Sequence, residues 1–159
     1  RGMTDEIDAK ALYSGKYDPI DDIGFITNDK WGFTIGYSPD GLVWDNGLVE
    51  IKSRRQKFQI ETIIDMVLPD EYKIQCQTGL LVSEREWLDF ISYCAGMPML
   101  TIRVFPDADV QKKIVEAAEI FEGKIQNLMT GYNLTIKSEA RLIPTERKKP
   151  DQQMLVTGE

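Results

Sequence analysis

The alternation of apolar and polar residues predicts two β-hairpins in the first half of the chain. Their strands are rich in β-branched and aromatic residues, as exposed-edge and half-buried strands usually are. The predicted strands cover residues 23–27 and 31–37 in the first hairpin, and residues 42–44 and 48–52 in the second. An Asn-Gly pair between two apolar runs is a strong hairpin signal, and Asn46-Gly47 occupies that place in the second hairpin.

Three helices and two more strands complete the pattern. A short helix is expected over residues 4–13, with Thr4 as a capping candidate and Gly15 as its stop. A second helix begins after Pro69, with Asp70 as its cap, Tyr72, Gln75 and Gly79 on one side and Ile74, Leu80, Leu81 and Val82 toward the core. Strands follow over residues 87–94 and 99–105, and a long amphipathic helix with a buried stripe runs from residue 106 to Gly131. This order predicts a mixed α/β fold whose central sheet carries helices on its faces.

The second hairpin concentrates charged residues. Period-2 alternation places Leu48, Glu50 and Lys52 on one face of its second strand, while the intervening residues are apolar. Asp40 precedes the first strand of the same hairpin, so closing the turn brings Asp40 and Glu50 near one another on adjacent strands. Lys52 then lies beside Glu50.

Composition narrows the class of protein. The chain has 159 residues, of which 42% are hydrophobic, and this suits one domain, expected over residues 1–131, followed by a weakly ordered extension over residues 132–159. No apolar stretch approaches the roughly 20 residues that a membrane-spanning helix needs, and no signal sequence is evident, so we expect a cytoplasmic protein with no membrane partner. The formal net charge of −7 argues against general nucleic-acid coating, although basic residues cluster at 52–57 and 147–149.

The residue inventory also limits the chemistry. The chain has no histidine, which excludes a Ser-His-Asp triad, a Cys-His pair and the usual zinc ligand sets. Cys76 and Cys94 are too few for a disulfide framework or a four-cysteine metal site, and they are expected to be reduced. Any reaction must therefore use carboxylates, lysine and tyrosine, or a metal ion held by oxygen atoms.

Two interpretations of the acidic and basic residues of the hairpin remain open at this point. Two carboxylates converging at a strand edge can hold Mg²⁺ or Mn²⁺, and an adjacent lysine can position an attacking water or offset charge on a phosphate. Alternatively, Glu50 and Lys52 form a surface ion pair and Asp40 serves only the turn. Spacing alone does not choose between them.

Further motifs resemble one family. Pro39-Asp40 followed by Glu50-Ile51-Lys52 resembles the PD-(D/E)xK nuclease signature, and residues 38–42 resemble the form found in phage lambda exonuclease and related viral recombination nucleases. The other landmarks occur in the family's order: Arg1-Gly2 with Glu6, then the Tyr-x-x-Gln-x-Gln pattern of residues 72–77, then Trp87 with Phe90, Ser92 and Tyr93.

The resemblance implies a restriction-endonuclease-like core and a Mg²⁺-dependent exonuclease that degrades one strand of linear double-stranded DNA from its 5′ end. Asp40, Glu50 and the backbone carbonyl of Ile51 would bind two Mg²⁺ ions, for which Mn²⁺ could substitute, and Glu6 would support the second ion. Lys52 would orient the water, and Gln75 would orient the lysine, the water or the phosphate. The resemblance further implies a homotrimeric ring, a single-strand annealing protein as partner, a role in phage-type recombination and a bacterial host cytoplasm.

Contacts with DNA are expected from Arg54 and Arg55, whereas Tyr72 is expected to pack rather than react.

The chain departs from the family pattern at residues 94–96, where members often have an acidic residue, proline and arginine. The family arginine that grips the 5′-phosphate lies upstream of the first residue shown, Arg1, and we expect that an upstream segment is missing. The alternatives are a non-catalytic DNA-end-binding or assembly subunit of the same fold, a Cas4-like or RecB-like nuclease, and an unrelated acidic α/β module. Two cysteines disfavour those Cas4-like or RecB-like forms that carry a four-cysteine cluster.

Overall fold

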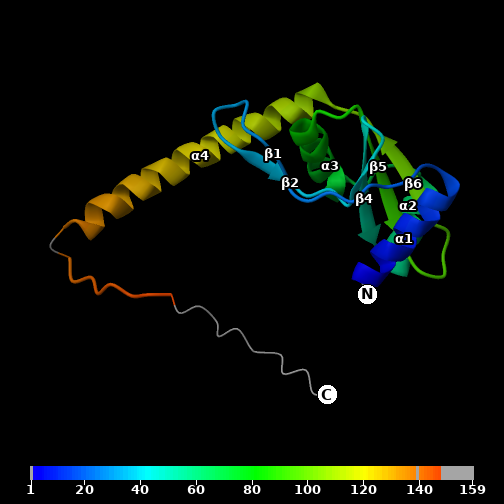
Figure 1. Cartoon of the computed structure of the whole chain (residues 1–159), viewed down its shortest axis with the longest axis horizontal. Helices are drawn as coiled ribbons and strands as arrows, with labels where there is room; N and C mark the ends of the chain where they lie inside the picture. The colour runs from blue at the N-terminus through cyan, green and yellow to red at the C-terminus, as the bar shows by residue number, and fades with distance from the viewer. Residues whose placement is uncertain (1, 139, 148–159) are drawn as a thin grey trace, which may run out of the picture. The chain divides into compact units, whose positions relative to one another are not determined.

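The computed structural model describes residues 2–138 and 140–147 of the chain (Figure 1). Arg1 and residues 139 and 148–159 lie outside the described residues, and so the arginine of the predicted Arg-Gly landmark and two of the three basic residues at 147–149 lie outside them. The helices and strands, in chain order, are α1 (Gly2–Lys16), β1 (Ile26–Asn28), β2 (Ile35–Tyr37), β3 (Gly41–Val43), β4 (Gly47–Ser53), α2 (Gln56–Asp65), α3 (Asp70–Ser83), β5 (Trp87–Tyr93), β6 (Leu100–Val104) and α4 (Ala108–Ile136).

Four strands form a mixed central sheet in the order β3-β4-β5-β6. β4 pairs with β3 antiparallel and with β5 parallel, and β6 pairs with β5 antiparallel. β1 and β2 form a separate antiparallel pair that packs against α3. The predicted fold class, a mixed central sheet flanked by helices, is confirmed. Both predicted hairpins are also present, although only the second belongs to the central sheet.

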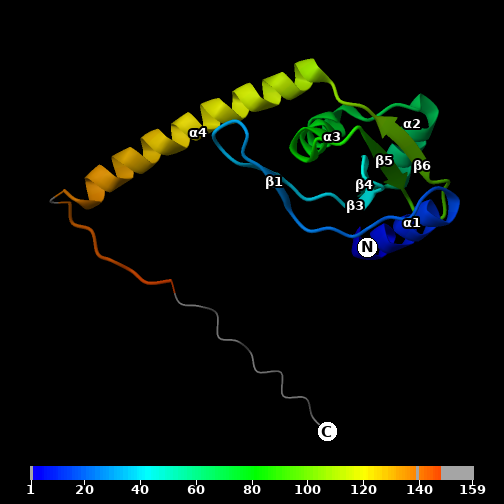
Figure 2. The same cartoon turned by 45° about the horizontal axis from the view of Figure 1, so that its top comes forward.

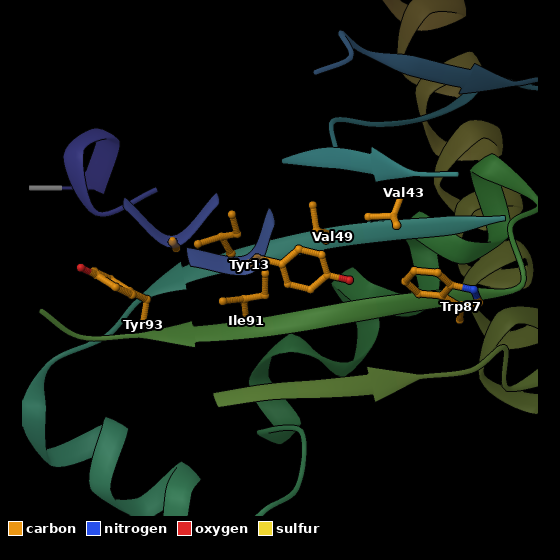
Figure 3. Packing of buried hydrophobic residues seen from close by; sticks show 8 residues of the cluster. Tyr13, Val43, Val49, Trp87, Ile91 and Tyr93 are labelled. Carbon is orange, nitrogen blue, oxygen red and sulfur yellow. The ribbon is translucent and has the colours of Figure 1, made fainter. Parts of the chain in front are cut away.

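The two faces of the sheet carry separate apolar clusters, with α1 on one face and α3 on the other (Figures 1 and 2). On the α1 side, Tyr13 packs against Val49 and Ile91 of the two central strands (Figure 3). On the α3 side, Leu48 and Phe90 pack with residues of the helix. This division confirms the predicted alternation along β4, because Glu50 and Lys52 share the face of Leu48.

A polar network attaches α1 to the sheet. The Tyr13 hydroxyl donates a hydrogen bond of 2.6 Å to the buried carboxylate of Asp89 on β5. Arg103 of β6 donates two hydrogen bonds of 2.8 Å to the same carboxylate and stacks over the Trp87 ring, 3.8 Å from its centroid. The charge of Asp89 is thereby paired and hydrogen-bonded, as a buried carboxylate requires. The helix and the two strands are held in fixed positions relative to one another.

The turn between β3 and β4 differs from the prediction. Val43 pairs with Gly47, so the turn has three residues and Gly47 is part of the strand. The left-handed backbone conformation occurs at Trp44, whose φ is 51°. Gly47 serves close packing instead, because a Cβ atom there would lie 2.2 Å from Cη2 of Trp87. Two hydrogen bonds stabilise the turn, since Arg85 donates to the carbonyls of Trp44 and Gly47 at 2.7 and 2.9 Å.

Several predicted helix ends were wrong. α1 begins before Thr4 and continues through Gly15, and α3 has Pro69 rather than Asp70 as its N-cap residue. Ile74 of α3, expected toward the core, is 56% exposed. These positions have only local signals in the sequence, and tertiary packing overrides such signals.

Helix α2 was not predicted. Its contact with the sheet is polar, because the buried Gln59 side chain donates to the carbonyls of Ser92 and Pro98 at 3.1 and 2.8 Å. The Ser92 hydroxyl donates in return to Gln59 Oε1 at 2.6 Å. Phe58 and Ile60 are exposed. The apolar periodicity of this helix therefore does not mark its buried face.

Helix α4 begins where it was expected, with Asp107 Oδ1 accepting a hydrogen bond from the Val110 amide at 3.1 Å. It does not stop at Gly131 but runs to Ile136, and none of its residues, all of which are described, is buried. The predicted buried stripe is therefore wrong. The chain divides into two compact units, Arg1–Glu122 and Gly123–Glu159, and the central sheet lies in the first. Within the described ranges, no helix has the length and apolar character needed to cross a membrane.

Candidate active site

The carboxylate of Glu50 is the centre of a cluster on the α3 side of β4. Glu50 is 2% exposed, and its Oε1 atom forms an ion pair of 2.5 Å with Lys52 Nζ and accepts a hydrogen bond of 2.7 Å from Gln75 Nε2 of α3. Its Oε2 atom accepts a hydrogen bond from the Tyr37 hydroxyl at the end of β2. Three elements that are distant in the sequence thus converge on one buried acid.

Asp40 lies at the adjacent edge of β4, in the loop that leads into β3. Its backbone amide donates to the Val49 carbonyl at 3.2 Å, and its Oδ2 atom accepts a hydrogen bond from the Ile51 amide at 2.6 Å. β3 begins at Gly41, opposite Val49, so β4 extends beyond the first residue of β3 at Ile51. The Asp40 side chain occupies the place that the next strand residue would have taken, and this fixes its carboxylate beside the strand that carries Glu50.

The pKa of Asp40 is raised from 3.8 to about 6. Burial is the largest cause of this rise, and the nearby charges of Glu50 and Glu6 add to it. The Ile51 amide and the Lys52 ammonium act in the opposite direction without cancelling the increase. A carboxylate in this state gains stability when a further cation approaches.

Helix α1 places Glu6 toward Asp40 but not in the cluster around Glu50. Glu6 forms an ion pair of 3.1 Å with Lys10, which also pairs with Asp22 at 2.9 Å. Asp5, which sequence reasoning did not select, is buried and accepts a hydrogen bond from the Ser53 hydroxyl at the end of β4. Glu6 therefore acts on the site through its charge in this structure.

The two arginines after β4 have different environments. Arg54 is 6% exposed, donates to Glu71 and to the Tyr72 hydroxyl at 2.6 Å, and lies over the Tyr72 ring. Arg55 is exposed, and both arginines line a cleft of about 360 Å³ together with Gly2 and Ser53. Tyr72 packs against Phe90 with ring centroids 5.1 Å apart, in agreement with a packing role.

The donor atoms present suit a hard divalent cation. Asp40, Glu50 and the main-chain carbonyl of Ile51 offer oxygen, the donor that Mg²⁺ prefers. The nearby Cys76 thiol is not a competing ligand, because burial raises its pKa to about 12 and keeps it protonated. Across residues 2–138 and 140–147, no three acidic or thiol side chains converge closely enough to hold an ion by themselves. Ion binding at this edge would therefore need the Ile51 carbonyl beside the two carboxylates.

Tyr37 is the residue of this cluster that sequence reasoning missed. It was predicted only as a strand residue, and nothing in the sequence connects it with Glu50. Burial and the charge of Glu50 raise its pKa well above its usual range, so the hydroxyl stays protonated and donates. One general signal was available, since a buried tyrosine hydroxyl requires a hydrogen-bond partner.

Comparison with known proteins agrees with this architecture. The crystal structure of an alkaline exonuclease, LHK-Exo, from Laribacter hongkongensis matches with a TM-score of 0.74 and 30% identity, over 85% of this chain and 74% of that one. The structure of LHK-Exo in complex with dAMP gives the same score and identity over 85% and 73%. The crystal structure of SSO0001 shares only the fold, with a TM-score of 0.53 and 14% identity over 89% and 61%. No protein-family model and no curated protein sequence matches the chain.

The mixed sheet, with two acids at the edge of its second strand, defines the class as an α/β nuclease fold of the restriction-endonuclease-like type. Identity of 30% over most of LHK-Exo then specifies the family. The chain belongs to the phage lambda exonuclease-like family of PD-(D/E)xK nucleases.

Proposed function

We propose that the protein is a metal-dependent exonuclease that degrades one strand of linear double-stranded DNA in the 5′-to-3′ direction. The observation that carries this proposal is the convergence of Asp40, Glu50, Lys52 and Gln75 at one edge of β4, in a chain that belongs to a nuclease family. The relative LHK-Exo is named an alkaline exonuclease, and its complex with dAMP contains a mononucleotide of the kind that an exonuclease releases.

The proposed ion ligands are Asp40, Glu50 and the carbonyl oxygen of Ile51. Glu6 would contribute to a second ion from α1, and the ions would be Mg²⁺, with Mn²⁺ as a substitute. Bound in this way, the ions would supply a more acidic water and a positive charge next to the scissile phosphate. The raised pKa of Asp40 supports the proposal, because burial and the neighbouring acids disfavour its negative charge, which a bound cation would offset.

Lys52 and Gln75 would then act on the water and the phosphate. The Lys52 ammonium lies against Glu50 and the lysine side chain is 25% exposed, so an ammonium hydrogen would reach a water or a phosphate oxygen from the solvent side. Gln75 donates to the same Glu50 oxygen from α3 and keeps the lysine and the carboxylate in register. Lysine at this position positions the nucleophile and offsets the charge that develops on the phosphate.

DNA would approach along the cleft that Arg54 and Arg55 line. Arg55 is the better placed for a phosphate contact because its side chain is exposed, whereas Arg54 is already bonded to Glu71 and Tyr72. Such contacts fix the position of the duplex without reading its sequence. We further propose a homotrimeric ring around the DNA, a single-strand annealing protein as partner, and a role in phage-type recombination in the bacterial cytoplasm.

The test uses linear duplex DNA labelled at one 5′ end or one 3′ end, incubated with the purified protein in Mg²⁺ or in chelator. We expect release of the 5′ label as mononucleotide in Mg²⁺ and none in chelator. Lys52→Ala should abolish this release. Lys112→Ala is the matched control, because Lys112 pairs with Glu116 on the solvent side of α4 and its side chain is 76% exposed.

Equal digestion by Lys52→Ala and the unmodified chain would rule out the proposed site. An absence of metal-dependent digestion would reject the exonuclease and leave a DNA-end-binding subunit of the same fold. Sedimentation of the same preparations tests the ring separately, since a strict monomer that still digests DNA would refute the trimer alone.

A further inference from the structure

Tyr37 reaches Glu50 from outside the PD-(D/E)xK signature. It is the last residue of β2, is 6% exposed and donates its hydroxyl hydrogen to Glu50 Oε2. Gln75 and Lys52 both use the other oxygen, Oε1. The terminal torsion of a glutamate is broad, so donors on one oxygen alone leave the carboxylate free to rotate. The hydroxyl of Tyr37 provides the second point that fixes its plane.

Gly79 of helix α3 leaves the space that the Tyr37 ring occupies when its hydroxyl contacts Glu50. A Cβ atom on Gly79 would lie 2.6 Å from Cζ, 2.7 Å from Cε1 and 3.0 Å from the hydroxyl oxygen of the Tyr37 ring. These distances are too short for any other residue unless the ring moves. Gly79 follows Gln75 by four residues, so both lie on the same face of the helix. One face of α3 thus carries one donor to Glu50, Gln75, and makes room at Gly79 for the ring of the other, Tyr37.

We propose that Tyr37, seated against Gly79, is a positioning residue that holds the Glu50 carboxylate in the orientation in which it binds the divalent ion. This inference rests on the proposed function. Hydrogen bonds to an ionised acceptor are roughly twice as strong as neutral ones. Groups that orient a metal-binding carboxylate from behind typically change ion affinity by about 10-fold to 100-fold when they are removed.

Direct titration of the metal-free full chain with Mn²⁺ in a calorimeter tests the role of Tyr37 without any DNA. We expect Tyr37→Phe to weaken Mn²⁺ binding about 10-fold or more, because the ring still fills the slot but the donor is gone. Tyr13→Phe is the matched control, since it removes a hydroxyl that donates to another buried carboxylate, Asp89, on the opposite face of the sheet. Its Mn²⁺ affinity should stay within about twofold of the unmodified chain, by the same reasoning about contact with the ion.

Gly79→Ala provides a second route to the same group. It should weaken Mn²⁺ binding by displacing the ring, and it should add little further loss in a chain that already carries Tyr37→Phe. In digestion assays, Tyr37→Phe should raise the Mn²⁺ concentration needed for half-maximal rate more than it lowers the rate at saturating Mn²⁺. A merely structural role would instead affect Tyr37→Phe and Tyr13→Phe alike.

Wild-type Mn²⁺ affinity in Tyr37→Phe would overturn the inference, and so would an equal loss in Tyr13→Phe. Failure of the proposed function is a distinct result. If the unmodified chain binds Mn²⁺ but does not digest DNA, the exonuclease proposal fails while the comparison of affinities still decides the role of Tyr37. If the unmodified chain does not bind Mn²⁺, the inference fails together with the proposed metal site.

Discussion

Replacing Asp40 with asparagine should stabilise the metal-free protein at neutral pH. Asparagine has nearly the shape of aspartate, and its side-chain oxygen can still accept the hydrogen bond from the Ile51 amide. The substitution removes a negative charge that burial, Glu50 and Glu6 all disfavour. A residue proposed to bind the ion would thus reduce the stability of the fold in the absence of that ion.

The magnitude follows from the pKa. An acid whose pKa is raised on folding binds its proton more tightly in the folded protein, so its ionised form reduces stability. This loss is absent below pH 3.8, grows as the pH rises, and is complete above about pH 6. The difference between 3.8 and about 6 corresponds to about 3 kcal/mol. Because Asp40 is partly exposed, solvent screening reduces this to about 1 to 2 kcal/mol.

Urea unfolding in chelator at pH 4 and pH 8 measures this effect. Asp40→Asn should be more stable than the unmodified chain by about 1 to 2 kcal/mol at pH 8 and nearly equal to it at pH 4. Asp45→Asn is the control, because Asp45 is exposed in the turn after β3 and its substitution should change stability by less than about 0.5 kcal/mol. Adding Mg²⁺ at pH 8 should stabilise the unmodified chain and not Asp40→Asn.

An Asp40→Asn protein that is no more stable than the unmodified chain at pH 8 would refute this reasoning. A gain in stability of the same size at pH 4 would refute it too, because the carboxyl is then protonated and the charge cannot be its cause.

Three further substitutions test the packing and the basic residues. Gly47→Ala should destabilise the fold by about 1 to 3 kcal/mol, since the new methyl group meets the Trp87 ring. Gly15→Ala is its control, because a Cβ atom there meets none of the described residues, and urea unfolding should show no loss and a gain of up to about 1 kcal/mol from helix propensity. Arg54→Ala should lower the urea midpoint because Arg54 is buried in an ion pair, whereas Arg55→Ala should leave it unchanged. In salt-dependent DNA binding, Arg55→Ala should instead weaken affinity and reduce the slope of log affinity against log salt by about 1, and an unchanged slope would contradict a phosphate contact.

The sequence was sufficient to predict the central sheet and the proximity of Asp40 to the strand that carries Glu50. Strict alternation along β4 fixed which face carries Glu50 and Lys52, and the hairpin placed Asp40 beside that strand. Both features depend on short-range periodicity, which is strong in strands with one charged and one apolar set of residues. The family resemblance, rather than spacing, assigned Gln75 to the site, as a group that orients the lysine, the water or the phosphate, and its hydrogen bond to Glu50 was not predicted.

The remaining features depend on contacts that periodicity does not record. Helix α2 is held by the amide of Gln59 rather than by apolar residues, and its exposed Phe58 and Ile60 obscure the pattern. Tyr37 and Gly79 meet only because two elements distant in sequence pack together. Trp44, rather than a glycine, takes the left-handed position of the turn, because Gly47 is required within the strand.

The pairing of β4 on both edges also limits where the chain can change in length. β4 is matched residue by residue to β5, from Gly47 opposite Trp87 to Ser53 opposite Tyr93. One inserted residue within β4 would exchange its two faces, placing apolar side chains at the proposed ion-binding edge and charges beneath α1. The turn at residues 44–46 and the loop at residues 29–34 have no such constraint. Insertions and deletions among related chains should therefore accumulate in those segments, and a relative that differs in length between residues 47 and 53 should have lost the site.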